Sequence, residues 1–281
     1  MGTAHIADRY SVDRYNDLPH FHEAKRRLTE TVDAIPHLGD VICDYELHES
    51  LGVSLLHHHF PLYDDEQLAK RYDPEEKTAY MYPEGTTERR QPYMYAVTRT
   101  EEGISYEPVE VFARSESAEA VPTLAEIVDG REEFLREFAT VAERLDVTDT
   151  FGLTVLHWYI QEFDQEAEMP MEVTDEERRV LRVTIEPRER LDPETTTETL
   201  WTFTPREEAS VGTVGDHDSR FGPAHECSHS CNHTCNHTCN HTCNHTGNAP
   251  VITDLPDDIP IRPVEQPEGQ SWRSRLGSLF G

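Results

Sequence analysis

The sequence predicts an α+β domain made of two tandem copies of an α-β-β-β unit, followed by a disordered C-terminal tail. Three observations lead to this fold class: an ungapped internal repeat at an offset of 100 residues, an amphipathic helix ahead of each copy, and a change of composition after residue 204. The domain is assigned to 1–204, with repeat one at 19–112 and repeat two at 123–204. We expect a mostly antiparallel sheet with both helices on one face.

The first unit begins with a helix predicted from Pro19 to Ile35. Its apolar side chains recur at helical spacing and are Phe21, Ala24, Leu28, Val32 and Ile35. Three strands are predicted after it, at 51–60, 92–99 and 104–112, and residues 100–103 are predicted to join the last two as a hairpin.

The second unit repeats this order. A helix is predicted from Arg131 to Leu145, after Asp129 and with Glu132 three residues on, a spacing typical of a helix start. Its apolar face comprises Phe134, Leu135, Phe138, Val141, Ala142 and Leu145. Strands are predicted at 151–160, 179–186 and 195–203.

The repeat itself aligns residues 51–66 with 151–166. Five of the sixteen pairs are identical, among them Gly52 with Gly152 and His57 with His157, and four more pairs are conservative. Strand alternation predicts that one side carries Val53, Leu55, His57 and His59, with Leu153, Val155, His157 and Tyr159 at the equivalent positions.

Residues 205–271 are rich in proline and lack a periodic apolar pattern, so they are predicted to be a flexible linker. Inside this linker, residues 225–247 repeat a Cys-x-His pattern every four residues. The candidate metal ligands of this tract are His225, Cys227, His229, Cys231, His233, Cys235, His237, Cys239, His241, Cys243 and His245.

Thiolates and imidazoles are the ligands that zinc prefers, and copper, nickel or cobalt would also accept them. A tetrahedral ion takes four ligands, so the eleven side chains of the Cys/His tract allow at most two fully protein-ligated ions. The spacing differs from a Cys-x-x-Cys knuckle, and any site must therefore be organised by the metal. The alternative is that the repeat is a neutral expansion in a low-complexity linker.

A second candidate site combines His57 and His59 with Asp64 and Glu66, and repeats as His157, Asp164 and Glu166. Two imidazoles on one face of a strand with a carboxylate nearby are used by metal-dependent enzymes. The alternative is that the histidines are buried hydrogen-bonding residues, while Asp64 and Glu66 cap a short helix from Glu66 to Arg71. His20, His22, His37 and His48 are interpreted as scattered surface or packing residues.

Charge restricts the environment and the partners. The formal net charge is −30, from 25 basic and 55 acidic residues, and only three of the basic residues are lysines. Such a surface repels phosphate, so nucleic acid is excluded as a partner, and the composition resembles that of proteins from salt-accumulating archaea. No apolar run reaches membrane-spanning length and no signal peptide is evident, which predicts a cytoplasmic, reducing location.

Two short segments complete the sequence. Residues 52–60 read G-x-x-L-L-H-x-H-F, which resembles a motif of uncharacterised proteins without an assigned activity, and this resemblance implies no function. The last ten residues, 272–281, place Trp272, Leu276, Leu279 and Phe280 on one helical face between arginines. We expect this face to dock on a partner protein, on the domain itself or on a membrane interface.

Together these patterns favour a non-enzymatic binding or adaptor protein whose tail buffers or senses metal. A metal-dependent enzyme that uses His57 and His59 is the alternative, and a plain interaction domain with a neutral tail repeat is the third hypothesis.

Overall fold

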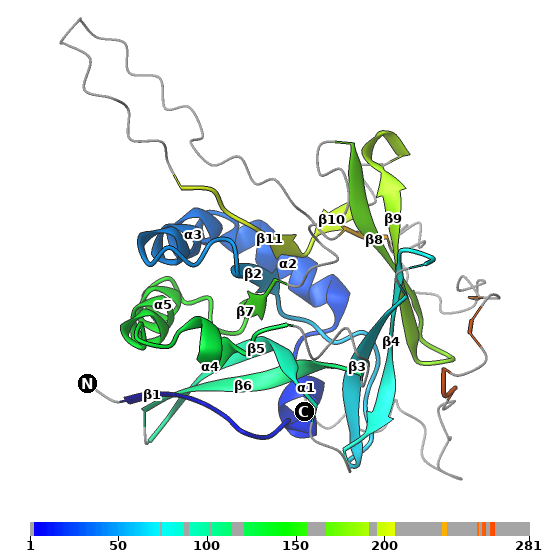
Figure 1. The fold of residues 1–281 in the computed structure, drawn as a ribbon, viewed down its shortest axis with the longest axis horizontal. Coiled ribbons are helices and arrows are strands. Elements are labelled where there is room, and N and C mark those ends of the chain that lie inside the picture. Colours follow the sequence, from blue (N-terminus) through cyan, green and yellow to red (C-terminus); the bar gives the residue numbers. More distant parts are fainter. Residues whose placement is uncertain are drawn as a thin grey trace, which may run out of the picture.

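The computed structural model of the chain is dominated by one curved mixed sheet with few helices (Figure 1). It describes residues 3–73, 75–86, 90–101, 103–113, 121–156, 167–190, 196–205, 232–234, 252, 255–256 and 259–261. The helices are α1 (Val12–Asn16), α2 (Phe21–Thr31), α3 (Ala34–Asp44), α4 (Leu124–Ile127) and α5 (Glu133–Arg144), with a 3-10 turn at Arg188–Arg190. None of them is long and apolar enough to span a membrane within the part of the chain that the structure describes.

The strands of the first half are β1 (Thr3–Ile6), β2 (Leu51–Leu55), β3 (Glu66–Asp73), β4 (Thr78–Gly85), β5 (Pro92–Thr100) and β6 (Gly103–Phe112). Those that follow are β7 (Phe151–Val155), β8 (Glu168–Asp175), β9 (Val180–Pro187), β10 (Thr196–Glu198), β11 (Leu200–Trp201) and β12 (Asn232–Thr234).

The order of strands brings the sheet back on itself. The path runs β10-β12-β8-β9-β4-β3-β6-β5-β7-β2-β11, and β1 adds to β6. Its two ends, β10 and β11, are separated in the chain by Thr199 alone. Antiparallel pairings predominate, but β1 with β6, β3 with β6 and β12 with β8 are parallel, which makes the sheet mixed.

The helices α3 and α5 pack against each other and beside β2 and β7, as Figure 1 shows. Leu38 and Ile42 of α3 share one apolar cluster with Phe138 of α5 and with Val53 and Leu153 of the central strands. Fully burying a side chain of this kind stabilises the fold by roughly 1.5–3 kcal/mol. This layer is the main core of the molecule.

The structure corrects the predicted first helix. Residues 19–35 do not form one helix, because α2 ends at Thr31 and a second helix, α3, begins at Ala34. Pro36 lies in the first turn of α3, where its missing N–H has no intrahelical partner to lose. At Gly39 a Cβ would lie 2.2 Å from Cδ1 of Phe203, so a glycine inside this helix permits close packing. The predicted second helix, by contrast, is confirmed as α5.

Several predicted strands also change. The strands at 92–99 and 104–112 and their hairpin are confirmed as β5 and β6. The predicted strand at 51–60 was too long, since β2 ends at Leu55. The predicted strand at 151–160 is confirmed as β7 up to Val155, and residues 157–160 lie outside the described part of the chain. The predicted helix from Glu66 to Arg71 is wrong. These residues form β3, because pairing with β4 and β6 outweighs the helical preference of the segment.

Local geometry recurs between the two halves of the chain. The peptide N–H of Leu47 donates to Ile42 and that of Val147 donates to Ala142, each at 2.9 Å. The residue before each of these donors, Glu46 or Asp146, has a φ of 57°. The helix α3 with β2 and the helix α5 with β7 are therefore joined by the same type of turn, 100 residues apart.

Pairing across the centre of the sheet has the same symmetry. In the antiparallel ladder of β2 with β7, Val53 lies opposite Leu153, its equivalent in the repeat. In the ladder of β4 with β9, Tyr80 lies opposite Arg182, at an offset of 102. On either side of Val53 the pairs are crosswise, Leu51 with Val155 and Leu55 with Phe151. A ladder in which the central residue meets its own equivalent and its neighbours pair crosswise is the pattern of a local two-fold axis.

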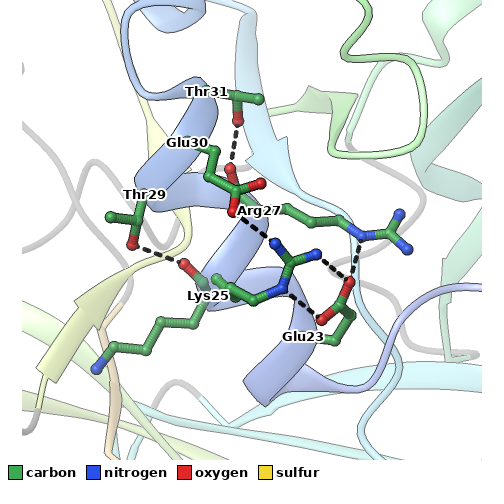
Figure 2. A network of polar contacts seen from close by, with 7 residues as sticks. Glu23, Lys25, Arg27, Thr29, Glu30 and Thr31 are labelled. Carbon is green, nitrogen blue, oxygen red and sulfur yellow. Dashed lines mark hydrogen bonds and ion pairs between the residues drawn. The ribbon is translucent and has the colours of Figure 1, made fainter.

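Arginine side chains on the surface form ion pairs with neighbouring glutamates. On α2, Arg26 donates to Glu23 and Glu30, and Arg27 donates to Glu23 (Figure 2). These side chains lie three or four residues apart on an exposed helix face, where such pairs contribute little individually.

Candidate functional site

Most of the Cys/His tract and the C-terminal segment 272–281 lie outside the described residues. The exception is β12, the strand at Asn232–Thr234, whose backbone is described. The peptide groups of this strand pair with β8 in parallel and with β10 in antiparallel orientation. One part of the tract therefore belongs to the sheet.

The register of β12 matches that of the end of β6 in the first half. In β6, Val111 and Phe112 lie opposite Ala69 and Lys70 of β3. In β12, the equivalent positions Asn232 and His233 lie opposite Met171 and Glu172 of β8, which are the residues 102 positions after Ala69 and Lys70. β12 thus extends the second half of the sheet in the way β6 extends the first.

The histidines of the second candidate site do lie together, although not on a strand. His57 and His59 follow β2 and are both buried, with ring centroids 4.6 Å apart. Nδ1 of His57 lies 2.9 Å from the carbonyl oxygen of Leu55 and must donate to it, since a carbonyl has no proton to give. Burial lowers the pKa of His57 to about 4, so its ring is neutral at physiological pH.

The carboxylates expected beside these histidines have other positions. Asp64 is exposed, and Glu66 is buried in an ion pair with Arg179. The equivalent residues His157, Asp164 and Glu166 lie outside the described part of the chain. A carboxylate that the sequence did not point to lies near the pair instead: Oε1 of Glu110, in β6, is 4.0 Å from Nε2 of His59.

Glu110 belongs to a buried polar cluster that the sequence does not mark. Its carboxylate accepts a hydrogen bond from the hydroxyl of Tyr93, and Nζ of Lys70 lies 5.1 Å from the centre of the Tyr93 ring. Burial raises the pKa of Glu110, although the charge of Lys70 and the Tyr93 bond both oppose the rise.

Glu172 of β8 extends the cluster from the second half of the chain. Burial raises the pKa of its carboxyl to about 7, with Lys70 lowering it and Glu110 raising it further. Lys70 and Glu172 lie 102 residues apart in the hairpins β3–β4 and β8–β9, and one is a basic residue while the other is an acidic one. The positive charge of Lys70, which acts on both carboxyl groups, opposes the binding of a metal cation at this place.

A third group of titratable side chains lies at the surface. Nε2 of His20 is 3.4 Å from Oε1 of Glu176, and the ring of His20 is 5.5 Å from that of His58 and 5.6 Å from that of His22. A parallel backbone bridge between His20 and His58 joins the start of α2 to the loop after β2. From the sequence, His20 is interpreted as a scattered residue because His58 and Glu176 are far from it in the chain. The backbone bridge between His20 and His58 is a long-range contact that the sequence does not reveal.

Within the ranges that the structure describes, no group of three or more His, Cys, Asp or Glu side chains is placed so that it could hold a metal ion without rearrangement. Comparison with known proteins gives no relative: no protein-family profile, curated protein or solved structure matches the chain.

Proposed function

We propose that this chain is a metal-binding protein without catalytic activity of its own, in which the Cys/His tract binds zinc or another borderline ion. The observation that carries the proposal is the density of ligands: eleven thiol and imidazole groups lie between residues 225 and 245. Such groups bind borderline ions by releasing protons, so binding is strong at neutral pH.

The register of β12 supports a tract that works next to the domain. Four of the eleven ligands precede β12 and six follow Thr234, so each side of the strand carries enough groups for one tetrahedral ion. Because the ligands alternate along a chain, many sets of four are nearly equivalent. We therefore expect binding that weakens gradually as the cysteines are replaced one at a time.

The test is a zinc titration of the reduced full-length chain beside a variant in which the five tract cysteines are serine and the six tract histidines are glutamine. The natural chain should bind up to two more ions than the variant. If the two chains bind zinc alike, or if the difference is a Kd no tighter than about 1 mM, roughly 4 kcal/mol, the tract is a neutral expansion and the proposal fails.

We also infer that the domain arose by duplication of one unit. The recurring turns after α3 and α5, the self-equivalent ladders of β2 with β7 and of β4 with β9, and the matching register of β6 and β12 support this inference. In this interpretation α3, and not the predicted helix 19–35, is the partner of α5.

The enzymatic alternative is favoured by one observation, the approach of Glu110 to His59. Two imidazoles and one carboxylate are a common set for a catalytic metal. Elemental analysis of the tract variant decides this point: stoichiometric metal that is lost in His57→Ala would establish a metal site in the buried cluster.

A further inference from the structure

The surface group formed by His20, His58 and Glu176 has connected geometry. His20 faces Glu176 at 3.4 Å and His58 at a ring distance of 5.5 Å. The charge of Glu176 raises the pKa of His58 and that of His20 lowers it, although burial is the largest influence and the pKa is lowered overall. Each member of the trio thus interacts with the other two.

The tautomer of His58 is fixed by the backbone. Nδ1 of His58 lies 2.6 Å from the carbonyl oxygen of Leu18 and donates its proton there. The lone pair of the neutral ring is then on Nε2. Metal-binding histidines commonly have this arrangement, in which the second ring nitrogen donates to a carbonyl and orients the ligand.

Ring spacing is also compatible with a shared ion. Two imidazoles bound to one tetrahedral ion at 2.0–2.1 Å have ring centres about 5 Å apart. The two rings already have nearly this separation, whereas the three side chains do not yet surround a common point. Side-chain rotation can close the set, because the side chains of His20 and Glu176 are 40% and 53% exposed.

The trio of His20, His58 and Glu176 lies at the end of β8 towards which β12 of the Cys/His tract runs. β12 runs parallel to β8, and His233 lies opposite Glu172. Asp175, the last residue of β8, lies three residues further along the same direction, about 10 Å away at 3.3 Å per residue, and Glu176 follows it in the turn. The strand therefore points along β8 towards the end at which Glu176 is found.

We propose that His20, His58 and Glu176 form a second metal site, on the domain itself, that binds Zn²⁺ or a similar borderline ion through two imidazoles and a carboxylate. The site leaves a coordination position open to solvent or to a ligand from another segment. It does not depend on metal binding by the tract.

The experiment uses the full-length tract variant with all eleven tract ligands replaced, titrated with Zn²⁺ and, as a spectroscopic probe, with Co²⁺. We expect one ion per chain and a Co²⁺ spectrum of nitrogen and oxygen ligands, without the thiolate charge-transfer band that the natural tract should give. His20→Ala and Glu176→Gln should each weaken binding at least about tenfold.

Two further variants keep the result decisive. His37→Ala removes an exposed imidazole of α3 that is not part of the trio, and it should leave the affinity unchanged. His58→Gln retains an amide donor for Leu18 but loses the ring, and it should weaken binding as much as His20→Ala. If the tract variant binds no Zn²⁺, or if His20→Ala and Glu176→Gln bind as well as His37→Ala, the site does not exist, whatever the tract does.

Discussion

The buried ion pair of Arg179 with Glu66 offers the sharpest test of how the two halves are held together. Arg179 lies between β8 and β9 and is fully buried, and its guanidinium donates to both carboxylate oxygens of Glu66 in β3. The same group donates to the carbonyl oxygen of Pro61 at 2.8 and 3.1 Å. We choose Arg179→Met, which keeps the volume and removes the charge.

The expected loss follows from what the substitution leaves behind. The carboxylate of Glu66 would keep the bond from the peptide N–H of Tyr63, at 2.9 Å, but would lose its counter-charge in a place without solvent. Breaking a buried pair in this way costs about 3–5 kcal/mol. At about 2–4 °C per kcal/mol for a domain of this size, the melting temperature should fall by about 6–20 °C.

The assay is thermal and urea unfolding of Arg179→Met, Glu66→Leu and the double variant, at moderate and at high KCl. The double variant should be more stable than the sum of the two losses predicts, because an apolar pair replaces the ion pair without leaving a buried charge. The loss should be nearly independent of KCl, since salt screens buried charges little.

The matched control is Glu23→Gln on α2, whose carboxylate faces the exposed Arg26 (Figure 2). Its effect should be far smaller and should shrink further with added salt. If Arg179→Met costs less than about 1 kcal/mol, or if the two single losses simply add, the ion pair does not hold the hairpins together as argued.

Three further predictions concern the whole domain. Because a net charge of −30 must be screened, the melting temperature of the full chain should rise as KCl increases from 0.1 to about 3 M, and an unchanged value would contradict the halophilic interpretation. A Cβ at Gly52 or Gly152 would lie 2.8 or 2.6 Å from a backbone oxygen. Each Gly→Ala change should therefore lower the free energy of unfolding, measured in urea, by about 1–3 kcal/mol. Gly85→Ala should be nearly neutral, because its Cβ would lie 4.0 Å from the nearest backbone oxygen. Native Glu172 retains its proton up to about pH 7 while the unfolded chain releases it near pH 4.5, so stability should fall as pH rises between these values. Glu172→Gln should avoid this loss, about 3 kcal/mol at pH 8, and equal pH profiles of the two proteins would refute the assignment.

Local patterns predicted those elements whose side chains obey one period. The helix from 133 to 144 and the hairpin of β5 with β6 were recognised because amphipathic spacing and a glycine turn mark them. The helix from 34 to 44 was missed because Pro36 and Gly39 signal a break. In the structure the proline lies in the first turn and the glycine faces Phe203, so neither signal applies.

The sequence likewise predicted only part of each candidate site. The nearness of His57 to His59 followed from the sequence, whereas their neighbour Glu110 did not, because it comes from a strand fifty residues later. Likewise, nothing near His20 in the sequence points to Glu176. Charged residues in strands read as solvent-facing until pairing shows which of them are buried.

The sequence by itself determined the acidic character of the chain, its internal repeat at an offset of 100 and the ligand content of the Cys/His tract, because composition and spacing are properties of the chain alone. Only the tertiary structure decided that Glu66 to Arg71 is a strand, that the charge of Lys70 acts on two buried carboxyl groups and that His20 meets His58 and Glu176. These facts depend on which strands pair and in what register. Long-range pairing brings residues a hundred positions apart into contact, and the resulting burial changes the pKa of their side chains. A local sequence pattern specifies neither the pairing partner of a strand nor the burial of its side chains.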